Sequence, residues 1–147
     1  MTVIRLETLI AAPPERCFDL SRSVDVHLAS AARTGEHVAA GPTSGLLEPG
    51  DEITWGARHL GLRRRLTVRL TEYDRPRHFR DEQVRGPFRA MRHDHRFELH
   101  GDGTLMLDVF EFRTRLPPLD ALIVAPHLRR FLAARNDTIR RLAESGD

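Results

Sequence analysis

The chain has 147 residues, of which 40% are hydrophobic and 30% charged, and its formal net charge is +2 at pH 7. This length and composition predict a single soluble domain over residues 1–147, with a sizeable core. No apolar run approaches the ~20 residues of a membrane-spanning helix. Cys17 is the only cysteine, which excludes an internal disulfide and favours a cytoplasmic protein.

All 23 basic residues are arginine. Their small excess over the acidic residues is poor support for nucleic-acid binding, so we predict no nucleic-acid partner. The densest basic run is Arg63-Arg64-Arg65. Because this run begins an alternating strand, we expect at least one of its side chains to point to water.

The first forty residues predict a strand followed by two short helices. Residues 2–11 alternate, with Ile4 and Ile10 on the apolar face. Pro13-Pro14 ends this strand and begins a helix, because proline suits the first helical turn. A serine before Val24 can cap a second short helix that runs to Ala32.

From residue 36 onward, alternating side chains separated by Gly and Pro turns predict six further strands. They span residues 36–40, 51–59, 62–73 and 77–85, and the two arms of a hairpin within 88–112. Gly101-Asp102-Gly103 joins the arms. If this loop is a three-residue turn with a bulge, His95 lies opposite or diagonal to Asp108.

After residue 118 the apolar period changes from two to about 3.6, which predicts a C-terminal helix from Pro126 to Glu144. Proline removes a helical hydrogen bond, so we expect a kink or a restart at Ala125-Pro126. Arg135 lies near the apolar stripe, where we expect its guanidinium to reach water. An alternative is contact with an anionic ligand group at a pocket mouth.

The inner face of the predicted sheet holds polar groups among apolar ones, which is typical of a small-molecule pocket. The twelve candidate ligand-binding residues on this face are Trp55, Leu66, Val68, Phe79, Asp81, Gln83, Met91, His93, His95, Met106, Asp108 and Phe110. The polar members either orient a ligand or form a closed network in which His95 and Asp108 satisfy one another.

Several motifs of this chain resemble the START/Bet v 1-like superfamily, also called SRPBCC or helix-grip proteins. They are the phrase Ile10-Ala11-Ala12-Pro13-Pro14-Glu15-Arg16-Cys17-Phe18, the stretch from Phe79 through Asp81-Glu82-Gln83 to Gly86-Pro87-Phe88, His93-x-His95-x-Phe97, and Met106-x-Asp108. The three motifs between Phe79 and Asp108 are similar to those of a bacterial subgroup of this superfamily.

The resemblance covers essentially the whole chain and implies an α+β helix-grip fold. In this fold a curved antiparallel sheet of about seven strands wraps around a long C-terminal helix, and two short helices follow the first strand. The resemblance also implies a cavity between sheet and helix that holds lipids, polyketides, sterols, quinones or hormones.

We therefore favour a protein that binds or transports a hydrophobic small molecule, lipid-, quinone- or polyketide-like, without catalysis and without a cofactor. One alternative is a polyketide cyclase- or dehydratase-like enzyme that uses His95 and Asp108, with His93, for proton transfer. Another is a protein-interaction module with a vestigial cavity. His93, His95 and an aspartate also supply three plausible metal ligands, but we predict no metal.

One apolar stripe is expected on the outer face of the sheet. Leu105, Leu107 and Val109 lie on the face opposite Met106 and Asp108. Such a stripe marks either a subunit contact or a surface covered by another element. The first interpretation predicts a homodimer.

Overall fold

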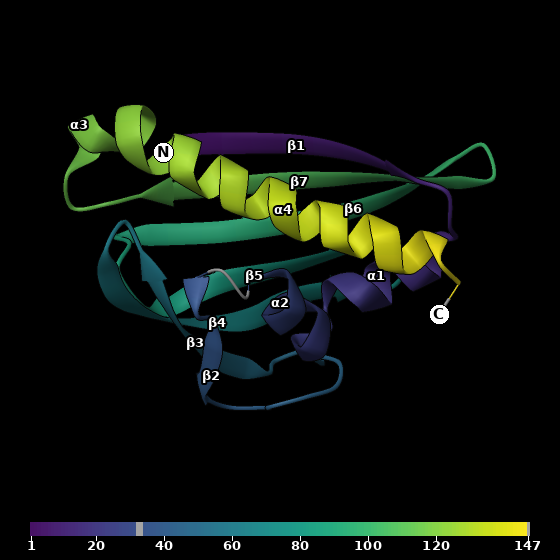
Figure 1. Ribbon diagram of the computed structural model, residues 1–147, viewed down its shortest axis with the longest axis horizontal. Coiled ribbons are helices and arrows are strands. Elements are labelled where there is room, and N and C mark those ends of the chain that lie inside the picture. The colour runs from purple at the N-terminus through teal and green to yellow at the C-terminus, as the bar shows by residue number, and fades with distance from the viewer. Residues whose placement is uncertain (32–33, 147) are drawn as a thin grey trace.

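Seven antiparallel strands form one curved sheet, which a long C-terminal helix crosses on its inner side (Figure 1). The computed structural model describes residues 1–31 and 34–146. The strand order is β1-β7-β6-β5-β4-β3-β2. The strands are β1 Thr2–Ile10, β2 His37–Ala40, β3 Glu52–His59, β4 Leu62–Asp74, β5 His78–Arg85, β6 Ala90–His100 and β7 Gly103–Arg113.

Two short helices follow the first strand, as the sequence predicts. They are α1 Pro14–Ser21 and α2 Val24–Ser30; the predicted end of the second at Ala32 lies outside the described residues. The Ser23 side chain accepts the backbone N–H of Val26 at 3.2 Å, which satisfies one free donor in the first turn of α2. The helix-grip fold expected from the sequence is therefore confirmed.

The C-terminal helix begins with an irregular segment. Helix α3 Pro117–Leu119 continues into a π-helical turn, Asp120–Val124, and then into α4, Ala125–Glu144. Pro126 lies at the start of α4, where its missing N–H is tolerated. The predicted restart at Ala125-Pro126 is thus present, as a π-helical turn immediately before it.

The hairpin β6–β7 has the predicted faces but a tighter turn. His100 pairs with Gly103, so only Gly101 and Asp102 form the loop, and Gly101 has a φ of 59°. The pairing runs without a bulge from His100 to Ala90, so the three-residue turn with a bulge is not the geometry adopted. His95 still lies directly opposite Asp108, because the shorter loop preserves the alternation.

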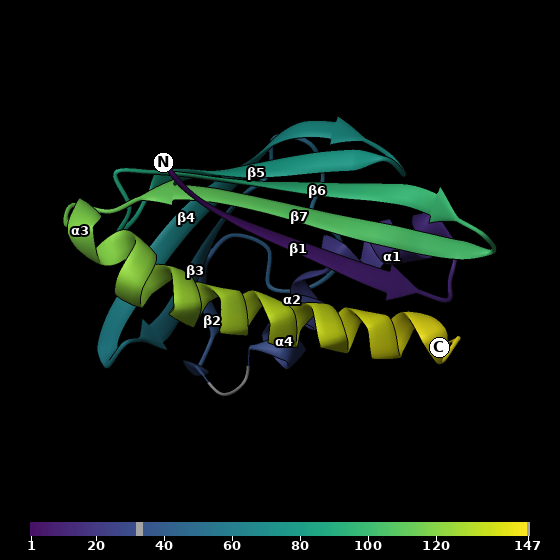
Figure 2. The ribbon, with the colours of Figure 1, turned by 90° about the horizontal axis from the view of Figure 1, so that it is seen from above.

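The core fills one end of the space between sheet and helix. Phe18 of α1 is fully buried, with its ring centroid 5.1 Å from that of Phe79 and 5.3 Å from that of Phe97. Ile139 of α4 belongs to the same cluster. Figure 2 shows α4 running along the sheet from this end to α3 at the other. No helix in the described ranges is long and apolar enough to span a bilayer.

Candidate functional site

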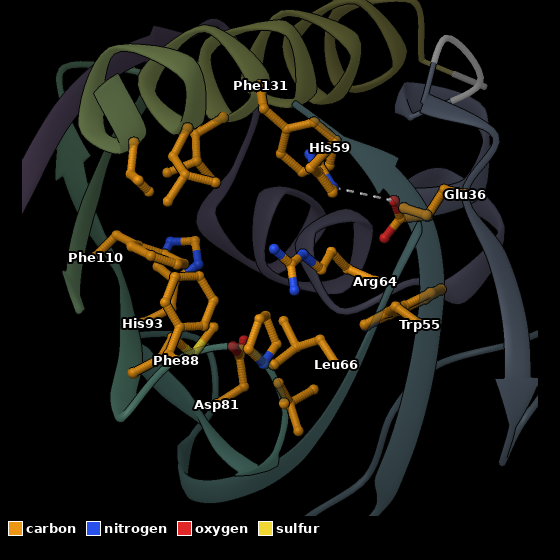
Figure 3. Close-up of a pocket in the computed structure, with 18 of the residues that line it drawn as sticks. Glu36, Trp55, His59, Arg64, Leu66, Asp81, Phe88, His93, Phe110 and Phe131 are labelled. Carbon is orange, nitrogen blue, oxygen red and sulfur yellow. Dashed lines mark ion pairs between the residues drawn. The ribbon is translucent and has the colours of Figure 1, made fainter. Parts of the chain in front are cut away.

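A cavity of about 720 Å³ lies between the sheet and the first half of α4 (Figure 3). Its walls are mostly apolar. The sheet contributes Trp55, Leu66, Val68, Phe79, Met91 and Phe110, and α4 contributes Leu128, Phe131 and Leu132. The residues that both line the cavity and are exposed come from the β3–β4 hairpin and from the segment after β7, so the mouth lies there.

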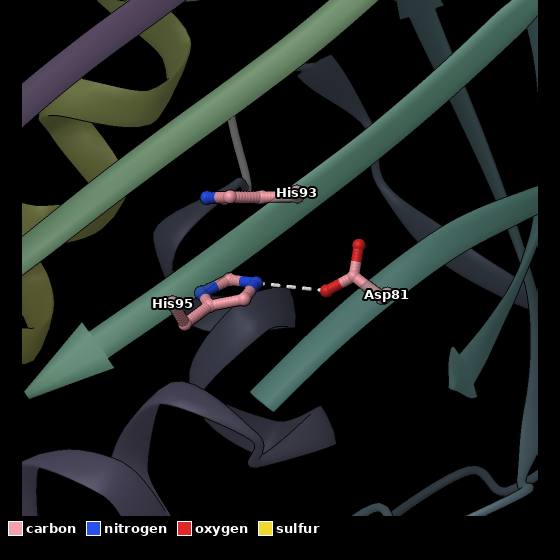
Figure 4. A group of neighbouring side chains, drawn as sticks. All are labelled: Asp81, His93 and His95. Atoms are coloured by element: carbon pink, nitrogen blue, oxygen red, sulfur yellow. Dashed lines mark hydrogen bonds and ion pairs between the residues drawn. The ribbon is translucent and has the colours of Figure 1, made fainter. Parts of the chain in front are cut away.

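Four polar side chains are brought together on the inner face of β5, β6 and β7. The Nε2–H of His93 donates to Asp108 at 2.7 Å, and the Nε2–H of His95 donates to Asp81 at 2.8 Å. The two imidazole rings stack with centroids 3.7 Å apart. Figure 4 shows the rings one above the other on β6, with Asp81 beside His95.

The alternative of a closed network in which His95 and Asp108 satisfy one another would need a hydrogen bond between them, and the structure has none, although the two residues are paired in the register. Each carboxylate binds the histidine diagonal to it: Asp81 pairs with His93 in the register but bonds to His95, and Asp108 bonds to His93. Diagonal neighbours on a sheet face remain within reach of long side chains. The nearest approach of His95 Nδ1 to Asp108 is 3.6 Å.

Helix α4 closes this network from the other side. The Asn136 amide donates to Asp108 at 2.7 Å. Arg135 donates to the Asn136 side chain at 2.9 Å and to the Ser21 carbonyl at 3.2 Å, and lies 3.4 Å from His95 Nδ1. Arg135 is only 5% exposed, so the expectation that its guanidinium reaches water is wrong. A buried carboxylate 3.6 Å away compensates its charge.

The environment holds both carboxylates in their charged form. Burial alone would raise the pKa of Asp108, but the bond from His93 and the charge of Arg135 keep it far below its usual range. Burial likewise opposes ionisation of Asp81, and the bond from His95 outweighs it, so the pKa of Asp81 is lowered. Burial, followed by repulsion from His93, lowers the pKa of His95 to about 4.

These contacts decide which atoms face the cavity. Because Arg135 donates toward Nδ1 of His95, the proton of this neutral imidazole is on Nε2 and points at Asp81. The bond occupies Asp81 Oδ2, and within the described chain Oδ1 has no hydrogen-bond partner. The Asp81 side chain is 20% exposed and lines the cavity. The site therefore offers an unoccupied anionic acceptor at its polar wall.

The same residues are poorly arranged for a metal. Ligand atoms of Asp81, His93 and His95 lie within 4.8 Å of one another. However, both Nε2 atoms donate to carboxylates, and the stacked rings direct their lone pairs side by side rather than toward one point. In a second group, Glu72, His78 and Asp94, both carboxylates pair with Arg80, and His78 bonds to Asp94. The geometry favours a hydrogen-bonded network over metal coordination.

A second polar cluster lines the cavity near α2 and was missed in the sequence. The His27 Nε2–H donates to the buried Glu36 at 2.9 Å, and the His27 ring stacks on Trp55 at 3.9 Å. His59 Nδ1 and His127 Nε2 are 2.9 Å apart. Burial lowers the pKa of both His59 and His127. Alternation with Trp55 could have identified His59, whereas nothing in the pattern places Glu36 or His127.

Arg64 was also missed. Figure 3 shows its side chain extending into the cavity between Leu66 and His59. It is exposed and makes no ion pair with any residue the structure describes. Leu66 faces inward, and side chains alternate along β4, so Arg64 faces inward as well. The sequence pattern could therefore have identified Arg64 as a cavity residue.

The twelve predicted ligand-binding residues separate into two groups by position. Nine line the cavity: Trp55, Leu66, Val68, Phe79, Asp81, Met91, His93, His95 and Phe110. Gln83 instead bonds both backbone groups of Phe88 and holds the β5–β6 loop. Met106 is fully buried next to Ser21 of α1, and Asp108 lies beneath His93 and Asn136. Alternation predicts the face of a strand but not which positions a helix covers.

Solved structures share this architecture. The aromatase/cyclase Zhui from Streptomyces sp. R1128 superposes with a TM-score of 0.78 at 16% identity, covering 97% of this chain and 93% of that one. The protein TTHA0849 from Thermus thermophilus gives 0.73 at 18% identity, with 97% and 99% covered. Ara h 8.0201 gives 0.73 at 14% identity, with 98% of both chains covered. At these identities the likeness shows the fold.

The sequence itself matches a family. No curated protein matches it significantly. Residues 1–144, nearly the whole chain, match the family described as polyketide cyclase / dehydrase and lipid transport. The chain therefore belongs to this family, within the SRPBCC or Bet v 1-like superfamily.

Proposed function

We propose that this protein binds and transports a mostly apolar small molecule of lipid-, quinone- or polyketide-like chemistry. The cavity is the observation that supports this proposal. Its volume of about 720 Å³ falls in the ~300–1,000 Å³ range of small-molecule sites, and its walls are mostly apolar. This volume also argues against a protein-interaction module with a vestigial cavity.

The polar groups of the cavity define what the ligand must carry. Asp81 Oδ1 accepts a hydrogen bond from a hydroxyl or amide group at the inner end of the ligand, because no protein donor in the described chain occupies it. Arg64 offers an unpaired cation further toward the mouth and suits a carbonyl or acidic oxygen. The ligand is thus apolar along most of its length, with a donor at one end.

Ligand binding is testable with the protein's own chromophore. Trp55, the only tryptophan, lines the cavity, so its fluorescence should change when a fatty-acid or naphthoquinone probe enters. Ala57→Phe fills part of the cavity. It should weaken probe binding about tenfold or more, because less space is left for the ligand. Ala134→Phe is the control, since Ala134 is exposed on α4 and absent from the lining.

Native mass spectrometry supplies the second measurement. A co-purifying apolar compound that Ala57→Phe releases and Ala134→Phe retains supports the proposal. Folded protein that retains no compound and leaves Trp55 fluorescence unchanged with every probe contradicts it.

An enzyme of the cyclase or dehydratase type is the second candidate, and one observation favours it. Asp81 presents a carboxylate oxygen to the cavity and is backed by the His95 N–H, an arrangement suited to accepting a substrate proton. Its lowered pKa makes it a weak base, which is why we place binding first. Turnover of a polyketide or ester panel that Asp81→Asn and His95→Ala both abolish, with probe binding retained, would support the enzyme.

A further inference from the structure

Large apolar side chains are exposed together around the mouth of the cavity. Two belong to the turn of the β3–β4 hairpin and four to the segment that leads into α4. They are Leu60, Leu62, Leu116, Leu119, Leu122 and Ile123. All except Leu122 also line the cavity. Figures 1 and 2 both place α3 and the end of the β3–β4 hairpin at the same end of the molecule. We call this set the apolar rim.

The hairpin turn presents a leucine where the backbone disfavours one. Leu60 and Gly61 both have positive φ values, 50° and 78°, as a tight two-residue hairpin turn requires. Asn, Asp or Gly is the usual residue at such a position, and leucine has a steric cost there. Leu60 is nevertheless exposed, so its side chain gains no core packing in exchange. A surface that receives Leu60 would explain its presence.

Positive charge accompanies the apolar rim. Six exposed arginines lie in the same two segments: Arg58, Arg63, Arg64, Arg65, Arg113 and Arg115. None of the six forms an ion pair within the described residues. The only acidic residue in these segments, Asp120, is buried and accepts hydrogen bonds from the backbone and side chain of Thr114. The formal net charge of the whole chain is only +2, so the residues outside these two segments are net acidic. The net positive charge of the protein therefore lies at this end.

We propose that the apolar rim docks on an anionic lipid bilayer, with the leucines inserted among the acyl chains and the arginines other than Arg64, which extends into the cavity, at the phosphates. Separate side chains that protrude on both sides of an opening suit a fluid surface, which each can penetrate, and arginine side chains reach from apolar to charged layers. Charge complementarity selects anionic lipid over neutral lipid. Docking rests on the proposed function in one respect: an apolar ligand then passes between bilayer and cavity without crossing water.

Flotation with phosphatidylcholine vesicles, with and without phosphatidylserine, tests the proposal on the purified protein. We expect binding to the anionic vesicles, weaker binding to the neutral ones and loss at high ionic strength. Leu122→Glu should reduce binding to anionic vesicles about tenfold or more, since the charged glutamate would have to leave water to insert into the bilayer. Leu99→Glu is a matched control, because both leucines are 78% exposed and Leu99 lies near the β6–β7 turn at the opposite end.

The charge contribution has its own pair of variants. Arg63→Gln should weaken binding to anionic vesicles about fivefold, while Arg96→Gln, which removes one exposed charge from β6, should leave it unchanged. Equal losses for both members of either pair, or no binding to anionic vesicles, overturn the proposal. Self-association that Leu122→Glu abolishes, without vesicle binding, also overturns it and assigns the rim to a second copy of the chain.

The vesicle-docking test and the ligand-binding test can fail independently of one another. Leu122 does not line the cavity, so Leu122→Glu should bind the fluorescent probe in solution as the wild type does. Ala57→Phe should lose the probe but still float with anionic vesicles. Vesicle binding without probe binding would therefore contradict the proposed ligand binding but support the docking surface. Probe binding without vesicle binding would contradict only the docking proposal.

Discussion

Two aspartates on the same inner face differ in what they contact. Asp108 is 1% exposed, and each of its oxygens accepts a hydrogen bond, one from His93 and one from Asn136. Asp81 uses one oxygen for His95 and leaves the other to the cavity. We conclude that Asp108 supports the fold, whereas Asp81 is available to a ligand.

Replacing each aspartate by asparagine separates these roles. Asp108→Asn leaves Arg135 without its buried counter-charge and places an amide donor against the donors of His93 and Asn136, so we expect a loss of about 3 kcal/mol in the free energy of unfolding. Asp81→Asn can still accept from His95, and should cost about 1 kcal/mol or less. Urea unfolding measures both, and equal losses contradict the distinction.

The low pKa of His95 predicts how stability depends on pH. A pKa of about 4 in the folded state, against about 6.5 unfolded, means that the unfolded chain binds a proton first as pH falls. Stability is therefore full above pH ~6.5 and falls as pH drops toward 4, by at most about 3 kcal/mol. The charged and titratable groups around His95 are Asp81, His93, Asp108 and Arg135.

His95→Gln should flatten this part of the profile, because the variant has no group that the unfolded chain protonates preferentially at this position. Urea unfolding between pH 7 and 4 for both proteins checks it. His59 and His127 have lowered pKa values and contribute in the same direction, so some slope should remain. Parallel profiles for wild type and variant would show that His95 is not held neutral.

At the scale of elements, the π-helical turn before α4 positions one side of the mouth. Ala125 donates its N–H to the Asp120 carbonyl, and the Asp120 side chain holds Thr114. This turn therefore ties the end of β7 to the start of α4 and presents Leu122 and Ile123 outward. An ordinary helix through the same residues would present a different set of side chains, because a π-turn adds a residue per turn.

The outer face of β7 carries the homodimer prediction. Leu105, Leu107 and Val109 are half-buried there, and the neighbours of Leu107 in the register are Glu7 and Arg96. If the stripe is a subunit contact, light scattering at high micromolar concentration should give a dimer mass for the wild type and a monomer mass for Leu107→Glu, because burying a charged side chain in an apolar contact opposes association. A monomer mass for both contradicts the dimer.

At the scale of the molecule, the two ends of the helix-grip differ. Phe18, Phe79 and Phe97 fill the end where α1 packs. The other end, beneath the first half of α4, is hollow and opens between the β3–β4 hairpin and the segment after β7. The solid end stabilises the fold, and the open end carries the polar groups, the unpaired Arg64 and the apolar rim.

The strands, their buried faces and the position of the long helix could be predicted from the sequence, because side-chain alternation and helical period are local properties of the chain. The sequence predicted His95 opposite or diagonal to Asp108, and the two residues lie directly opposite. That each carboxylate bonds to the diagonal histidine could not be predicted, since the choice between partners on neighbouring strands depends on where each ring has room in the packed protein.

The same limit explains the remaining differences. The burial of Arg135 depends on a carboxylate from β7 that lies far away in sequence. Whether Met106 and Asp108 line a cavity or lie beneath a helix depends on how α1 and α4 cover the sheet, whereas Gln83 is held by the backbone of Phe88. Local patterns assign a side chain to a face; the packing of distant elements decides whether that face meets another side chain, a cavity or water.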